Sequence, residues 1–63
     1  MSDSLELIQS RVTEELRKNA AVDVYRLTAV LQEHCPELPA DVIAEEVSAV
    51  IIKAHGNAIW NKG

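Results

Sequence analysis

Residues 39–56 have the sequence PADVIAEEVSAVIIKAHG, which predicts a helix at the centre of the fold. Pro39 suits the first turn, where its missing N–H costs nothing, and Asp41 suits the positive end of the helix dipole. Gly56 suits the left-handed residue that ends many helices. We expect this helix over about residues 39–55. Apolar side chains occupy most of its circumference, which favours contacts on several sides: Val42, Ile43, Val47, Val50, Ile51 and Ile52.

A first helix is expected upstream, over about residues 4–18. Asp3 followed by Glu6 resembles a capping box, with Asp in place of Ser or Thr. Arg17 and Lys18 fall in the last turn, where positive charge is favourable. Four apolar residues recur at helical spacing and form one predicted stripe: Leu5, Ile8, Val12 and Leu16.

A second helix is expected over about residues 23–35. Asp23 is a suitable N-cap, and Pro36 ends the helix because the residue before a proline avoids the helical region. The predicted apolar face consists of Val24, Leu27, Val30, Leu31 and His34. We expect Cys35 to be a small buried residue that closes the helix end.

The whole chain, residues 1–63, is predicted to be a single all-α domain. Its composition, 48% apolar and 25% charged, is typical of a globular chain. The fold expected is a small three-helix bundle with the C-terminal tail packed back on the core. Ile59 and Trp60 support the folded-back tail, because both are unfavourable to leave in water.

Charge and cysteine content narrow the class of protein. Ten acidic residues oppose six basic ones, and the net charge of −4 disfavours nucleic acid. A single cysteine, Cys35, cannot form a disulfide within the chain. No apolar run approaches the ~18 residues of a membrane span, and the N-terminus does not resemble a signal peptide. These features predict a cytoplasmic protein with no membrane contact.

The sequence contains no pattern typical of a metal-binding or catalytic site. The only soft metal ligands are His34, Cys35 and His55, and their spacing does not suit chelation by one helix face. Three short helices also provide no obvious cleft or oxyanion-binding group beside Cys35. We therefore expect no enzymatic activity, no cofactor, no metal and no small-molecule substrate.

Four bulky side chains are the candidate partner-binding residues. Leu7, Tyr25 and Ile52 lie off the predicted core stripes, and Trp60 lies in the tail. A domain of about 60 residues buries only ~60% of its unfolded surface, so a partner subunit is a common source of further stability. We expect a protein-interaction or structural module that binds a protein partner or itself, most simply as a homodimer.

The alternative is a helix-turn-helix-like DNA-binding regulator, with Pro36–Pro39 as the turn. The helix that would enter the DNA groove starts near residue 40 and carries acidic residues in its first two turns. Acidic side chains there repel the DNA phosphates. The same acids, Asp41, Glu45 and Glu46, are either a solvated helix face or a patch for a basic partner. The protein-interaction hypothesis is therefore the preferred one.

Overall fold

The computed structural model describes residues 3–19 and 21–60. The elements follow the order α1 (Asp3–Lys18), β1 (Ala21–Asp23), α2 (Val24–His34), α3 (Ala40–Lys53) and β2 (Asn57–Ile59). The three predicted helices are confirmed. The all-α class is wrong in one respect, because β1 and β2 form a two-stranded parallel sheet. The side chain of Asp3, expected to cap α1, lies outside the described residues.

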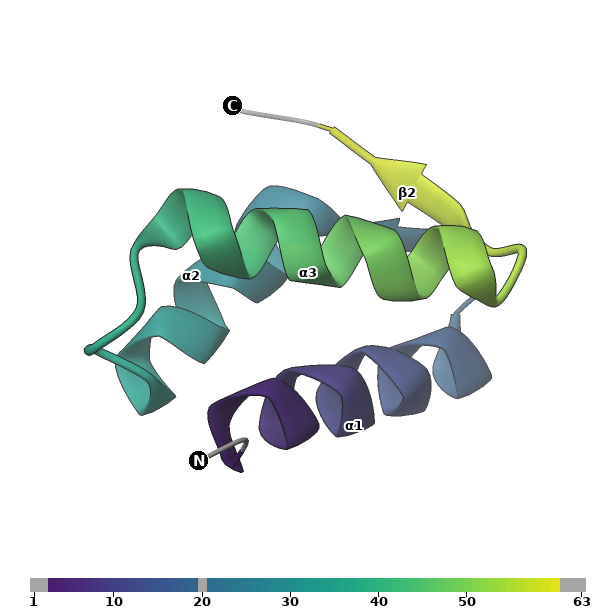
Figure 1. Ribbon diagram of the computed structural model, residues 1–63. Helices are drawn as coiled ribbons and strands as arrows, with labels where there is room; N and C mark the ends of the chain where they lie inside the picture. Colours follow the sequence, from purple (N-terminus) through teal and green to yellow (C-terminus); the bar gives the residue numbers. More distant parts are fainter. Residues whose placement is uncertain (1–2, 20, 61–63) are drawn as a thin grey trace.

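Helix α3 is the centre of the fold, as predicted. It contacts α1, α2 and β2, and Figure 1 shows it crossing the molecule with α1 on one side and β2 on the other. Its buried side chains, Ile43, Val47 and Ile51, complete a single core. The other members of that core are Ile8, Val12, Val22, Val24, Leu27, Leu31 and Cys35. These neighbours account for only part of the apolar character of α3, because Val42 and Ile52 remain exposed.

The buried stripe of α2 differs from the predicted one at its end. Thr28 and Cys35 are buried, whereas His34 is exposed. The buried positions 24, 28, 31 and 35 are spaced four, three and four residues apart, which leaves residue 34 on the flank. Thr28 enters the core because its hydroxyl donates to the Val24 carbonyl at 2.6 Å. Cys35 closes the helix end as predicted, with its N–H donating to the Leu31 carbonyl.

The turn after α3 returns the chain to the sheet. The Gly56 N–H donates to the Ile51 carbonyl at 2.9 Å and the His55 N–H donates to the Ile52 carbonyl at 3.0 Å, which is a Schellman motif. The left-handed residue is His55, with φ of 59°, and not Gly56 as predicted. Gly56 instead packs closely against α1: a Cβ there would lie 2.6 Å from Leu16 Cδ2, so the Leu16 side chain would have to move.

The parallel sheet links the two ends of the α2–α3 segment. Val22 pairs with Ala58 in the register, and both side chains face the helices. Parallel strands need a long crossover connection, and here α2 and α3 together provide it. The predicted return of the tail to the bundle therefore takes the form of a strand. No described helix combines the length and hydropathy needed to cross a membrane.

Candidate functional site

Large apolar side chains remain at the surface of this small fold. Ile52 is 70% exposed and Trp60 is 55% exposed. Leu7 and Tyr25 are also exposed, so all four predicted partner-binding residues are accessible. Leu5 was expected in the core stripe and is 41% exposed, because Ile8 and Val12 occupy the inward side of α1. The exposed large apolar residues among those described are Leu5, Leu7, Tyr25, Val42, Ile52, Ile59 and Trp60.

Two of the predicted residues are brought into contact by the sheet. Tyr25 lies in the first turn of α2, directly after β1, and Trp60 directly follows β2. Their ring centroids are 5.7 Å apart with an interplanar angle of 77°, an edge-to-face arrangement. Because β1 and β2 are parallel, their carboxyl ends meet at the same end of the sheet, and the rings meet there. Trp60 thus contacts the folded chain while more than half of it stays exposed.

Leu7 and Ile52 do not share a surface with each other. The Gln9 side-chain amide donates to Glu46 at 3.3 Å, which marks the flank of α1 that faces α3. Leu7 is two residues before Gln9, a rotation of about 200°, so it points away from α3. Lys53 lines the shallow groove between α1 and α3, whereas Ile52 does not line it and is rotated about 100° around the helix axis from Lys53.

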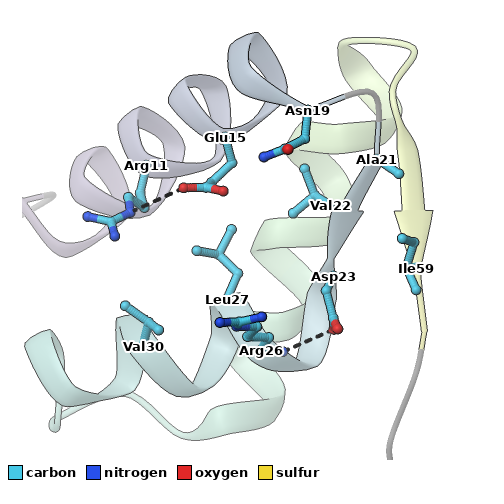
Figure 2. Close-up of a pocket in the computed structure, with 10 residues that line it drawn as sticks. All are labelled: Arg11, Glu15, Asn19, Ala21, Val22, Asp23, Arg26, Leu27, Val30 and Ile59. Carbon is cyan, nitrogen blue, oxygen red and sulfur yellow. Dashed lines mark hydrogen bonds and ion pairs between the residues drawn. The ribbon is translucent and has the colours of Figure 1, made fainter.

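A cleft of about 400 Å³ lies between α1, β1 and α2 (Figure 2). Its charged rim includes an ion pair between Arg11 Nε and Glu15 Oε2 at 3.9 Å. Asp23 accepts the backbone N–H of Arg26 at 3.1 Å and so caps α2. The lining consists of Arg11, Glu15, Asn19, Ala21, Val22, Asp23, Arg26, Leu27, Val30 and Ile59. Two arginines and two acids give the rim no net charge, and the lining includes neither cysteine nor histidine.

The titratable groups are dispersed over the surface. Within residues 3–19 and 21–60, no three His, Cys, Asp or Glu side chains gather closely enough to hold a metal ion. The Ser4 hydroxyl donates to Glu37 Oε2 at 2.5 Å, and this bond lowers the pKa of the Glu37 carboxyl, with a smaller lowering from a backbone hydrogen bond. The pair joins the start of α1 to the turn between α2 and α3.

The charged surface is mixed, as the sequence indicates. Besides the Arg11–Glu15 pair, Lys18 Nζ lies 3.6 Å from Glu14 Oε1 on the same helix. The acids of α3 divide between two environments, because Glu46 is half-buried beside Gln9 whereas Asp41 and Glu45 are exposed. Asp41 and Glu45 are thus the more exposed part of this candidate surface for a basic partner.

Comparisons with protein-family models, with curated proteins and with solved structures give no match. The chain's own residues are therefore the basis for a functional assignment. Sequence patterns placed Leu7, Tyr25 and Ile52 off the core stripes, and all three are exposed. Ile59 and Trp60 were expected to leave water by packing on the core, but they stay 43% and 55% exposed, and the contact between the two aromatic rings had no local signal. It depends on a strand pair whose members are separated by two helices.

Proposed function

We propose that this protein is a small interaction module that acts through its exposed apolar side chains, by binding a second copy of itself as a two-fold dimer. The observation that carries the proposal is the exposure of Ile52 and Trp60. Burying a side chain of this size contributes roughly 1.5–3 kcal/mol on the area scale, so an interface that covers both side chains stabilises the dimer. Two-fold dimers are the commonest symmetric assembly that covers such residues.

The alternative within this proposal is that the same exposed apolar side chains bind a different protein. The exposed aromatic pair, Tyr25 and Trp60, supports either form, because tyrosine and tryptophan are enriched at protein interfaces. The chain's small size favours self-association, since a domain of about 60 residues leaves much of its surface uncovered.

DNA binding is the less favoured function. Helix α3 would have to read the major groove, and its exposed positions include Asp41, Val42 and Glu45. Its only basic residue is Lys53, in the last turn. Acids repel phosphates, and α3 offers no Arg, Asn or Gln to a purine edge. The proposed function likewise assigns no catalytic group to the cleft of Figure 2, whose lining includes no cysteine or histidine.

The mass of the protein in solution tests the proposal. Sedimentation equilibrium from low to high micromolar concentration should show a rise from the monomer mass of 6.9 kDa towards twice that value. A matched run at high salt should keep the dimer, because an apolar contact is not screened by ions. A constant mass of 6.9 kDa up to high micromolar concentration would contradict self-association.

A further inference from the structure

The outer edge of β2 is open. The sheet consists of β1 and β2 alone, so among the described residues each strand has one strand neighbour. Figure 1 shows β2 at the outside of the fold, with no described helix or strand beyond it on the side away from β1. Such an edge presents unpaired N–H and C=O groups that can pair with another strand. Sheets of two strands are also marginal in water and gain stability from additional strands.

The two strands differ in the charge beside their free edges. Beyond β1 lies the cleft of Figure 2, whose rim holds Arg11, Glu15, Asp23 and Arg26. Residues 57–60 carry no charge in a chain of which a quarter is charged. Natural edge strands are commonly protected by lysine, other charges or proline, and β2 has none of these. An uncharged strand suits a second copy in particular, because like charges placed opposite each other would oppose self-pairing.

A three-residue strand is too small to hold two copies together alone. Stable interfaces cover about 800 Å² per partner, which is nearly a fifth of the 4440 Å² surface of this chain. Helix α3 contacts β2 and continues along the same side of the molecule. Ile52 lies in the last turn of α3, five residues before β2 begins, and it does not line the groove that faces α1. A partner that extends the sheet beyond β2 would therefore also cover Ile52, the most exposed of the large apolar side chains described.

We propose that β2 of one copy pairs with β2 of a second copy to form a four-stranded sheet, with Ile52 of both copies buried beside it. This inference rests on the proposed self-association and specifies its surface. A two-fold axis makes identical strands antiparallel, so the central pair is antiparallel and each outer pair stays parallel. The antiparallel pair is also the more stable ladder per residue.

The acids of α3 are compatible with this arrangement. Glu45 and Asp41 precede Ile52 by seven and eleven residues, which is ~10 and ~16 Å along the helix axis. Two copies of α3 related by an axis near Ile52 run in opposite directions. Their acids therefore lie at opposite ends of the contact, at its rim, where water screens them.

Three variants test the surface, each compared with the wild type by sedimentation equilibrium. Ile52→Asp and Ile59→Lys should each raise the dimer dissociation constant at least tenfold. Leu7→Asp tests the competing surface, because Leu7 is another candidate partner-binding residue, 42% exposed, and it points away from α3. It should leave the constant within about twofold of the wild type. Far-ultraviolet circular dichroism of all three should match the wild type, since none of the replaced side chains belongs to the core.

Amide hydrogen exchange gives a second readout that needs no substitution. The amides of residues 57–59 should exchange more slowly as protein concentration rises through the dimer transition. If the mass doubles while exchange in this segment is independent of concentration, or if only Leu7→Asp dissociates the dimer, the proposed function stands and this surface is wrong. If the wild-type mass stays at 6.9 kDa, both proposals fail.

Discussion

Among the described residues, His55 at the end of α3 is the only non-glycine residue with a positive φ, which is 59°. The left-handed conformation brings Cβ of an L-residue close to the following carbonyl oxygen, at a cost of roughly 1–2 kcal/mol. Glycine avoids that contact but loses more entropy on folding. The His55 side chain is exposed, so its removal breaks no core contact.

We therefore predict that His55→Gly stabilises the protein by about 0.5–1 kcal/mol in urea unfolding. His55→Ala is the control, because it removes the imidazole and keeps the Cβ. It should leave the free energy of unfolding nearly unchanged. A stabilisation by alanine equal to that by glycine would show that the imidazole, and not the backbone conformation, is unfavourable.

The bond between Ser4 and Glu37 gives a pH-dependent prediction. The donated hydroxyl holds the pKa of Glu37 below its ordinary value of 4.5. A carboxyl with a lowered folded-state pKa stabilises the fold above its unfolded-state pKa, and this contribution disappears as pH falls through the folded-state value. Ser4→Ala should therefore raise the pKa of Glu37 in an NMR titration and weaken the loss of stability on acidification below pH 4.5. Ser10→Ala, an exposed serine of the same helix, should change neither.

At the level of elements, Asp23 is the junction between β1 and α2. Its carboxylate accepts the Arg26 N–H at 3.1 Å, and the strand ends where the helix begins. Asp23→Ala should lower the free energy of unfolding by ~1 kcal/mol, the usual effect of losing an N-cap. Asp23→Asn retains an acceptor oxygen and should lose much less. Equal losses for the two variants would show that the charge of Asp23, and not its capping bond, supports the junction.

The elements also show what the sequence can predict. The helices have eleven or more residues each, long enough for an apolar period of 3.6 to be visible. Strands of three residues are too short to display alternation, and β1 and β2 are brought together only by the packing of the helices between them. The exposure of Tyr25 was predictable from its position off the helix stripe, but the half-exposed state of Trp60 and the contact between the two rings were not, because both depend on that strand pair.

Dependence on tertiary contacts also explains why the left-handed residue after α3 was predicted at Gly56 and is found at His55. Glycine is the commonest left-handed residue after a helix, so sequence rules select Gly56 for that role. In the folded protein α3 ends at Lys53 with Ala54 as its C-cap, so the left-handed position falls on His55, and Gly56 packs against Leu16 of α1. A contact between α1 and the α3 turn is a tertiary property, which no local pattern in residues 53–57 contains.

At the level of the whole molecule, the C-terminal strand closes the fold. Proteins of 63 residues are stable by roughly 3–9 kcal/mol, so a small change in packing is a large fraction of the total. Ala58 is half-buried against the core, and Trp60 adds the edge-to-face contact with Tyr25. Removal of residues 58–63 takes away the strand pair and this contact together.

We predict that this truncation lowers the free energy of unfolding by about 1–3 kcal/mol, the lower part of the range for large-to-small core changes, because Ile59 and Trp60 are half-exposed. Trp60→Ala in the full chain should lose only ~0.5–1.5 kcal/mol, since it removes the aromatic contact and keeps the strand. Both are measured by urea unfolding at low micromolar concentration, below the proposed dimer transition. If the two variants are equally unstable, Trp60 alone holds the tail. If both are as stable as the wild type, β2 does not contribute to the stability of the monomer.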